Sequence, residues 1–209
     1  MEPMWKVIET IMVTRMRVIE LHDCLHGSVP ERGTGTATTE AKLAQQLAYL
    51  EQKPFYGVFL DLRKAFDAMD RERVLCLLEG YGVGPLMRRL IAGFWDQARL
   101  VCRAQGNYGT SFRARRGVTQ GGPLSPTLFN LLVDAVVREW LWTLYNAQTS
   151  REWAAQVRRE LFAIFYVDDA LVASRDPEAL QRALDILVAL FEHVGLRTNT
   201  KKTKVCIFG

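Results

Sequence analysis

Apolar residues along this chain recur in two spacings, one typical of helices and one typical of strands. Spacings of three and four residues predict helices over residues 5–21, 40–51 and 70–78, and three more helices that open at Pro85, Pro126 and Pro177. Runs rich in β-branched and aromatic residues predict strands over 56–62, 161–167, 170–174 and 204–208, and a hairpin with strands 99–105 and 111–115. This interleaving of strands and helices indicates an α+β fold around a sheet.

The apolar stripes also predict which side chains of two helices face the core. In the helix over 40–51 the stripe consists of Leu43, Leu47 and Leu50. In the helix that follows Gly84 the stripe consists of Leu86, Leu90, Ile91 and Phe94. Since an amphipathic helix buries its apolar stripe, we expect these side chains to be buried.

Segments between the predicted elements are rich in residues that favour loops. A loop is predicted over the Gly- and Thr-rich stretch 27–39, a hairpin turn over 106–109 and a longer loop over 116–125. We interpret Asp67 and Asp134 as caps or surface carboxylates rather than metal ligands.

Composition excludes several classes of protein. Of 209 residues, 49% are hydrophobic and 24% charged, with a net charge of +4, which is typical of a globular domain. At about 150 residues per domain, one domain is expected. The longest apolar run, 161–167, is far shorter than the ~18–20 residues of a membrane helix, so we expect no membrane partner. The N-terminus shows no secretory signal.

The four cysteines are far apart and form no Cys-x-x-Cys pair, so we expect neither a structural zinc site nor disulfides. Such cysteines suit a reducing, intracellular compartment, with nucleus and cytoplasm both left open. His22, Cys24 and His26 are interpreted as residues at a helix end rather than as metal ligands. Basic clusters at 113–116 and 201–204 lie near candidate loops and favour a polyanionic partner.

Two adjacent carboxylates, Asp168 and Asp169, stand between two apolar strands. Like charges this close are costly unless a cation lies against them. A tight turn is the alternative interpretation, although two-residue hairpin turns favour Asp-Gly or Asn-Gly. A third carboxylate, Asp61, ends the strand over 56–62. If these strands lie side by side, three carboxylates meet at one sheet edge, which suits Mg²⁺; two such ions can activate a 3′-hydroxyl and stabilise a leaving pyrophosphate.

Five segments, in chain order, resemble motifs of reverse transcriptases. Phe165-Tyr-Val-Asp-Asp169 resembles their YxDD signature, Leu60-Asp-Leu-Arg-Lys-Ala-Phe-Asp67 their first palm motif, and Gly117-Val-Thr-Gln-Gly-Gly-Pro-Leu-Ser-Pro126 their second. Residues 195–203 are similar to the palm motif that follows, and residues 32–41 to a block in the fingers. The pattern is most like that of group II intron and non-LTR retrotransposon enzymes.

The resemblance implies a single reverse transcriptase catalytic domain over 1–209, with an antiparallel palm sheet and flanking helices. Residues 1–55 would be partial fingers and 56–209 mainly palm, with further fingers elements at about 71–116. We expect the thumb to lie outside this chain. Because duplex binding depends on phosphate contacts, we expect the chain by itself to bind primed RNA weakly, with strong salt dependence, and to extend it poorly.

The resemblance also implies roles at the sheet edge. Asp61, Asp168 and, more weakly, Asp169 would hold two Mg²⁺ ions, for which Mn²⁺ is a possible substitute. The carbonyl of Leu62 would be an additional oxygen ligand. Phe66 matches the aromatic residue that excludes a 2′-hydroxyl, with core packing as the alternative.

Further residues match family positions around the nucleotide. Gln120 and Gly121 would contact the incoming nucleotide, the alternative being a flexible loop before a helix. Lys202 would protonate or neutralise the departing pyrophosphate, or be a solvated surface residue. Arg32 would hold the template or the fingers loop, or be an exposed loop arginine.

These expectations point to the core of an RNA-directed DNA polymerase from a retroelement. Its partners would be an RNA template, a DNA or RNA primer and dNTPs, with the oligomeric state left open. One alternative is an RNA-dependent RNA polymerase, which Phe66 and the Tyr-Val-Asp-Asp sequence disfavour. The other is a non-catalytic remnant that binds RNA.

Overall fold

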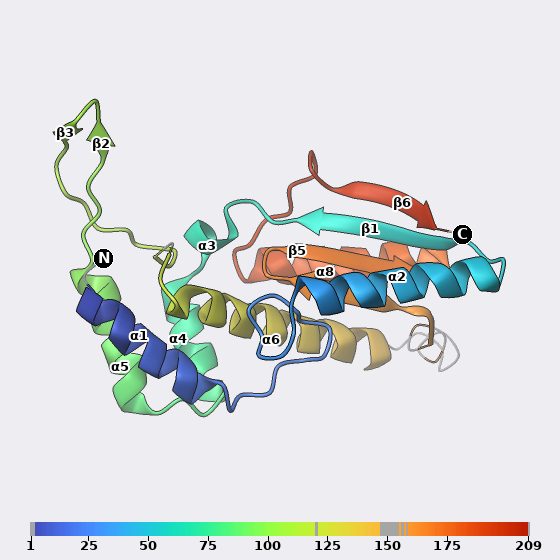
Figure 1. The fold of residues 1–209 in the computed structure, drawn as a ribbon, viewed down its shortest axis with the longest axis horizontal. Coiled ribbons are helices and arrows are strands. Elements are labelled where there is room, and N and C mark those ends of the chain that lie inside the picture. The colour runs from blue at the N-terminus through green and yellow to red at the C-terminus, as the bar shows by residue number, and fades with distance from the viewer. Residues whose placement is uncertain (1–2, 120, 147–154, 156, 158, 209) are drawn as a thin grey trace.

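A four-stranded antiparallel sheet carries the candidate carboxylates (Figure 1). The computed structural model describes residues 3–119, 121–146, 155, 157 and 159–208. The sheet order is β4-β5-β1-β6, from the strands β1 (Phe55–Asp61), β4 (Phe162–Tyr166), β5 (Asp169–Ser174) and β6 (Lys204–Phe208). β1 pairs antiparallel with both β5 and β6. The expectation that the strand of Asp61 lies beside the hairpin of Asp168 is therefore confirmed.

Helices pack on both faces of this sheet. On one face α6 (Leu124–Asn146) and α8 (Pro177–His193) pack together beneath fully buried Val172 and join the main core. On the other face, α2 (Thr34–Leu50) places Ala48 against Phe55 and Ala173 in a small second cluster. Alternation along the strands separates the two sets, because successive side chains point to opposite faces.

The remaining elements gather at the end of the molecule toward which β1 runs (Figure 1). They are α1 (Pro3–Met16), α4 (Arg71–Gly80) and α5 (Pro85–Gln97), with α3 (Ala65–Ala68) linking β1 to α4. A short hairpin, β2 (Arg103–Ala104) and β3 (Asn107–Tyr108), projects from this end. None of the helices in the described part of the chain is long and apolar enough to cross a membrane.

The second helix differs from its prediction in both its start and its buried face. α2 begins at Thr34, inside the predicted loop, because the Thr36 hydroxyl accepts the Gly33 N–H at 2.9 Å and caps the first turn. The predicted leucine stripe is exposed, with Leu43 at 54%, Leu47 at 45% and Leu50 at 75%. The small side chains Ala44 and Ala48 face the sheet instead, which lets the helix approach three aromatic rings: Phe55, Phe162 and Phe208.

Three further helices differ from their predictions, one in its buried face and two in their boundaries. In α5, Leu86 and Leu90 of the predicted stripe are exposed, whereas Ile91 is buried as predicted, together with Trp95. The first helix ends at Met16 rather than at residue 21. The long helix α6 begins two residues before Pro126, at Leu124.

The turn of the projecting hairpin comes earlier than predicted. Gln105 and Gly106 form it, with φ of +49° and +84°, which is the left-handed pair that two-residue hairpin turns need. An isolated bridge between Leu100 and Phe112 continues the pairing at the base. The hairpin was therefore predicted correctly, but its turn at 106–109 was not.

Asp134 is neither a cap nor a surface carboxylate. Its side chain in α6 is fully buried and accepts three hydrogen bonds of 2.6 Å, from the His22 N–H, the Tyr81 hydroxyl and Arg138 Nε. Burial and the hydrogen bond to Asp134 raise the pKa of Tyr81. The carboxylate thus joins α6 to the end of α4 and to the segment after α1.

Candidate active site at the sheet edge

Three carboxylates lie at one edge of the sheet. Asp61, the last residue of β1, pairs in register with Asp169, the first residue of β5. The Leu62 N–H donates to the Asp168 carbonyl at 3.3 Å, which continues the ladder beyond the strand ends. Because residues opposite each other on antiparallel strands share a face, the Asp61 and Asp169 side chains lie on the same side of the sheet.

The turn between β4 and β5 is one residue earlier than predicted. It consists of Val167 and Asp168, and Asp169 already belongs to β5. Val167 has a φ of +57°, a conformation that β-branched residues rarely adopt. Gly27 packs directly on it, since a Cβ there would lie 2.5 Å from Val167 Cγ2, and Asn130 Nδ2 donates to the Gly27 carbonyl at 2.6 Å. Packing from elsewhere in the chain therefore holds the strained turn that presents Asp168.

The segment after α8 closes over Asp61. The Asn199 N–H donates to the Asp61 carbonyl at 2.7 Å, and Asn199 Nδ2 donates to Asp61 Oδ1 at 2.8 Å. Lys202 Nζ donates to Asp61 Oδ2 at 3.1 Å. The N–H groups of Lys202 and Thr203 both donate to the Asn199 carbonyl, which keeps these side chains on one turn. Sequence reasoning selected Lys202 but assigned no role to Asn199, although the matched segment contains it.

Negative charge at this edge is only partly neutralised. Burial raises the pKa of Asp169, the carboxylates of Asp168 and Asp61 raise it further, and Lys202 lowers it. The three side chains are hard oxygen donors of the kind that Mg²⁺ prefers. In the part of the chain that the structure describes, no three His, Cys, Asp or Glu side chains are grouped closely enough to hold a metal ion. Lys202 is the cation that contacts Asp61 in this arrangement.

Phe66 lies in α3, between the core and the glycine-rich loop. Its half-buried ring stacks on Phe129 of α6, with ring centroids 4.9 Å apart. Its carbonyl accepts the Val118 N–H at 3.0 Å. The structure therefore brings Phe66 to the second palm motif, and its ring also packs on the core. Leu62 is buried and directly follows Asp61.

The loop over 116–125 is held by α3 and α4. Gly117 has a φ of +81°, and a Cβ there would lie 2.8 Å from Asp67 Cα, so only glycine allows this approach. Arg71 Nε donates to the Gly117 carbonyl at 2.8 Å, and Nη1 donates to the Ala114 carbonyl at 2.6 Å. Sequence reasoning missed Arg71, because no pattern distinguishes it from an exposed arginine in a first helical turn. Gly121 is exposed, and Gln120 lies outside the described residues.

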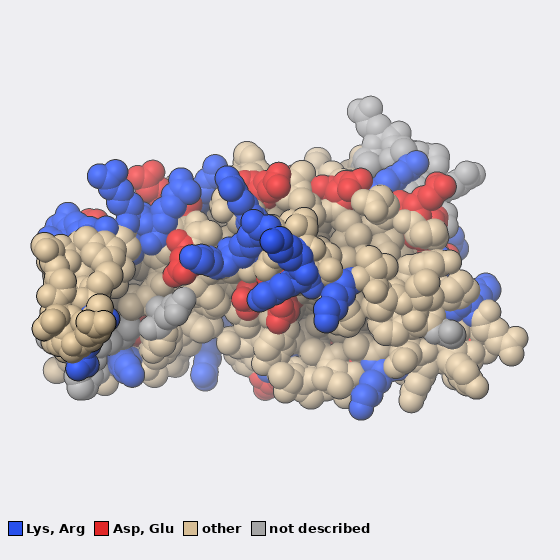
Figure 2. Space-filling view, turned by 90° about the horizontal axis from the view of Figure 1, so that it is seen from above, with Lys and Arg blue, Asp and Glu red and all other residues tan. Residues whose placement is uncertain are grey.

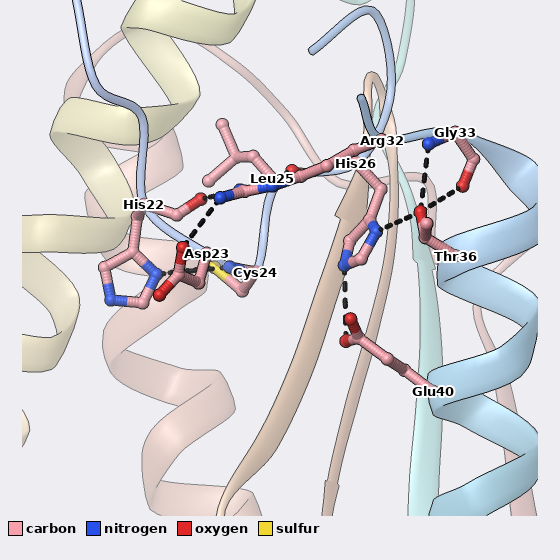
Figure 3. A network of polar contacts seen from close by, with 9 residues as sticks. All are labelled: His22, Asp23, Cys24, Leu25, His26, Arg32, Gly33, Thr36 and Glu40. Carbon is pink, nitrogen blue, oxygen red and sulfur yellow. Dashed lines mark hydrogen bonds and ion pairs between the residues drawn. The ribbon is translucent and has the colours of Figure 1, made fainter. Parts of the chain in front are cut away.

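Arg32 holds the segment that precedes α2 (Figure 3). Its Nη1 donates to the carbonyls of His22 at 2.9 Å and Leu25 at 3.1 Å, and its Nη2 contacts Asp23 at 2.7 Å. Of the expected roles, holding the loop is therefore the one that its contacts support.

His26 and Cys24 are engaged within the same segment. His26 is buried, with Nδ1 2.9 Å from the Thr36 hydroxyl and Nε2 3.3 Å from Glu40 (Figure 3). The Cys24 sulfur lies 3.1 Å from His22 Nδ1, and burial raises the pKa of its thiol to about 12. Of these two side chains, His26 joins the segment to the start of α2, and Cys24 contacts His22 within the segment.

Basic side chains frame the carboxylates. Figure 2 shows Lys and Arg residues gathered around Asp and Glu residues on the face seen from above. Arg63 and Lys64 are exposed and directly follow the strand that carries Asp61, and the Arg63 N–H donates to the Arg197 carbonyl at 2.7 Å. Lys201 and Lys202 are exposed on the segment after α8, from which Lys202 contacts Asp61. Such a field attracts a polyanion.

The fold is that of a polymerase palm. Telomerase from Candida tropicalis, solved with a fragment of telomeric RNA, matches 97% of this chain with a TM-score of 0.69 at 13% identity, over 33% of its own chain. The same telomerase truncated from its C-terminal domain matches with a TM-score of 0.67 at 14% identity, over 97% of this chain and 40% of that one. The predicted α+β palm is confirmed.

This chain belongs to the reverse transcriptase family. The sequence model described as "Reverse transcriptase (RNA-dependent DNA polymerase)" matches residues 1–207. The Pol polyprotein of the type-1 retrotransposable element R2 from Nasonia vitripennis is 29% identical over 155 residues, which are 74% of this chain and 14% of the polyprotein. The R2DM polyprotein from Drosophila melanogaster is 26% identical over 93% of this chain and 18% of its own length.

An R2 polyprotein from Popillia japonica is 27% identical over 95% of this chain and 27% of its own length. The chain therefore spans about a quarter or less of the length of these relatives. Their names confirm a likeness to retrotransposon enzymes, and the likeness to group II intron enzymes stays a prediction.

Proposed function

We propose that this chain is the catalytic core of an RNA-directed DNA polymerase, which adds dNTPs to the 3′ end of a DNA or RNA primer on an RNA template. The observation that carries the proposal is the register that pairs Asp61 with Asp169 beside Asp168, in a chain of the reverse transcriptase family. The activity of the whole protein, its substrates and an intracellular location belong to the same proposal.

The carboxylates Asp61, Asp168 and, more weakly, Asp169 would hold two divalent cations, Mg²⁺ or Mn²⁺, together with the Leu62 carbonyl, once Lys202 leaves Asp61 and the three side chains turn closer together than they lie in this structure. Bound ions of this kind supply an activated 3′-hydroxyl and charge neutralisation for the leaving pyrophosphate. Two observations support this assignment. The donors are all hard oxygens, and the pKa of Asp169 is raised by burial and then by repulsion from Asp168 and Asp61, a repulsion that a cation relieves.

Asn199 and Lys202 would act on the same carboxylate in different ways. Asn199 fixes Asp61 through two hydrogen bonds, one from its N–H and one from its side chain, and so orients the carboxylate. Lys202 is 69% exposed on a flexible stem, so its ammonium can leave Asp61 and turn toward a phosphate. There Nζ would neutralise the departing pyrophosphate, or donate its proton to it and regain one from water.

The surroundings of α3 would select the nucleotide. Phe66 would stand under the sugar and exclude a 2′-hydroxyl, which its contact with the loop at Val118 supports. Gln120 and Gly121 would contact the incoming dNTP, and the glycine lets backbone come close. Arg32 would hold the fingers segment through its bonds to the carbonyls of His22 and Leu25. Residues 1–55 and about 71–116 would form the fingers.

The test is primer extension on a primed RNA, comparing the parent with Asp168→Asn at equal concentration of folded protein. The matched control is Asp185→Asn, which removes the same charge from an exposed position on α8. Mg²⁺-dependent dNTP incorporation that the first variant loses and the second keeps supports the proposal. Because duplex binding depends on phosphate contacts, the assay is run at low and physiological salt, with and without flanking sequence.

Two other outcomes identify the alternatives. Preferred incorporation of rNTPs on the RNA template would identify an RNA-dependent RNA polymerase. Salt-sensitive binding of primed RNA, without incorporation in any form of the protein, would identify an RNA-binding remnant.

A further inference from the structure

Helix α1 carries a buried carboxylate with an unused oxygen. Glu9 is only 2% exposed. Its Oε1 accepts a hydrogen bond from Trp5 Nε1 at 3.0 Å, whereas Oε2 is buried without a hydrogen-bond partner among the described residues. Burial raises the pKa of Glu9, against the opposing effects of Trp5 and Lys6. Because an unpaired buried acceptor is costly, this oxygen requires an explanation.

The unpaired oxygen faces the glycine-rich loop. A Cβ at Gly122 would lie 2.7 Å from Glu9 Oε2 and 2.9 Å from Oε1, so the carboxylate fills the space that any side chain at this position would need. Gly122 is buried, and its neighbour Gly121 is exposed with a φ of +84°. The loop is otherwise closed by Ser125, whose hydroxyl donates to the Thr119 carbonyl at 2.6 Å.

The carboxylate is itself firmly anchored. Trp5, which donates to it, stacks on Phe94 of α5 with ring centroids 3.9 Å apart. Helix α1 also packs on α6, the helix that the loop leads into. Glu9 therefore transmits the position of α1 and α5 to the loop at Gly122.

We propose that Glu9 is a positioning residue for the nucleotide-contacting loop: its carboxylate braces Gly122, and its free Oε2 is an acceptor for a backbone N–H at this part of the loop. This inference rests on the proposed function, because the contact of the loop with dNTP is part of that proposal. It also explains why residue 122 is glycine although its φ is not in the left-handed region.

The first measurement is amide hydrogen exchange over residues 117–125 of the whole chain, which needs no catalysis. Glu9→Ala removes the brace, so exchange of this loop rises while exchange of the sheet stays as in the parent. Glu9→Gln keeps the length and an oxygen acceptor and therefore restores most of the protection. Glu20→Ala, at an exposed glutamate just beyond α1, is the matched control and leaves the loop unchanged.

The second measurement is a double-mutant cycle with Gly122→Ala. In the parent the new Cβ meets the carboxylate, so the loop shifts and the KM for dNTP rises, by about 10- to 100-fold for a displacement near 1 Å. In the Glu9→Ala background that space is empty, and adding Gly122→Ala has a much smaller effect, which is the signature of direct contact. Gly93→Ala, where a Cβ meets nothing within 4 Å, is the control. Both kcat and the Kd for primed RNA stay near parental values.

Three results would overturn the inference: loop exchange that Glu9→Ala leaves unchanged, exchange that rises equally throughout the protein, or additive effects of Glu9→Ala and Gly122→Ala. Should Glu9→Ala fail to fold, Gly122→Ala alone decides, because it leaves Glu9 in place and must still loosen the loop. If the expected exchange pattern is seen but dNTPs are never incorporated, either by this chain or by a form with flanking sequence, the proposed function is refuted and the brace stays supported.

Discussion

Asp61 at the sheet edge and Asp134 in α6 are both aspartates whose two carboxylate oxygens have protein donors, yet their surroundings differ. The donors of Asp134 are a backbone N–H, a hydroxyl and a guanidinium, all 2.6 Å away, around a carboxylate that is fully buried. Asp61 retains 21% of its side-chain exposure, and one of its two side-chain donors is the exposed ammonium of Lys202.

The difference separates a carboxylate that holds the fold from one that is free to react. Two donors of Asp134, the His22 N–H and the Tyr81 hydroxyl, come from other elements that pack on α6, so they cannot leave without opening the core, whereas Arg138 lies one turn along α6 and is half-exposed. Lys202 can leave Asp61 by rotating a solvated side chain, after which the oxygen is open to another cation. Two neighbours of like charge, Asp168 and Asp169, add repulsion at the edge.

The largest expected effect on activity comes from neutralising Asp168 at the sheet edge. Asp168→Asn is expected to lower Mg²⁺-dependent incorporation by roughly 10³-fold, the equivalent of several kcal/mol of metal-ion stabilisation. Asp61→Asn should have a similar effect and also disturb Lys202. The free energy of unfolding should change by about 0.5 kcal/mol or less, because the site is at the surface. Primer extension measures incorporation, and denaturant titration measures the free energy of unfolding. Near-parental activity of either variant would show that these carboxylates do not hold the metal ions.

The opposite pattern is expected for Asp134→Ala. It leaves Tyr81 and Arg138 facing an empty buried position, at a cost of about 3 kcal/mol for breaking a buried pair. Incorporation per folded molecule should stay within a few-fold of the parent. Denaturant titration measures the loss, with Asp185→Asn as the surface control. If Asp134→Ala were as stable as this control, the view of Asp134 as a structural hub would be wrong.

Phe66 lies between these two cases, since its ring packs on the core while its backbone contacts the loop. Phe66→Val removes the stack on Phe129, which costs about 1 kcal/mol. If the ring also excludes the 2′-hydroxyl, discrimination against rNTPs falls by up to ~10²-fold. Incorporation of the two nucleotide classes on one template measures the ratio, and Phe66→Tyr, which keeps the ring, is the control. If the ratio is unchanged in an active Phe66→Val protein, the role of Phe66 is core packing and not the exclusion of the 2′-hydroxyl.

The smallest expected effect is on the stability of the fold, through the negative charge of Asp169. Because its surroundings raise the pKa of Asp169, the ionised form is disfavoured in the folded state relative to the unfolded state. Without added metal, Asp169→Asn should therefore stabilise the fold at neutral pH, by about 0.5 kcal/mol at this exposed position. The gain disappears below the unfolded pKa, where the parent carboxyl is protonated in both states. Thermal melting against pH tests the sign, and a Tm below that of the parent at neutral pH would show that repulsion is not the dominant effect.

Added Mg²⁺ provides a companion measurement. A ligand that binds only the folded state raises its stability, so Mg²⁺ should raise the Tm of the parent more than that of Asp169→Asn or Asp168→Asn. Equal shifts in all three proteins would mean that the ion binds elsewhere.

The sheet and the three carboxylates could be predicted from the chain because they depend on local patterns. Alternation sets the face of each strand, and a strand that ends in Asp61 beside a hairpin that contains Asp168 leaves few registers. The reverse transcriptase resemblance rests on the same contiguous segments. The roles of Lys202 and Phe66 stay predictions.

The contacts that hold the site were decided by tertiary structure. Asn199 and Asp61 are 138 residues apart in sequence, and Arg71 and Gly117 are 46 apart, so no local pattern links either pair. The helical period of the leucines predicted the wrong buried face for α2. Its alanines are buried instead, because they are small enough to pack against the aromatic rings on the sheet. The sequence led to Asp134 being interpreted as a cap or surface carboxylate, and no pattern in it singles out Glu9. They are buried because elements distant in sequence pack around them, and only packing determines whether a carboxylate faces water, a donor or a glycine.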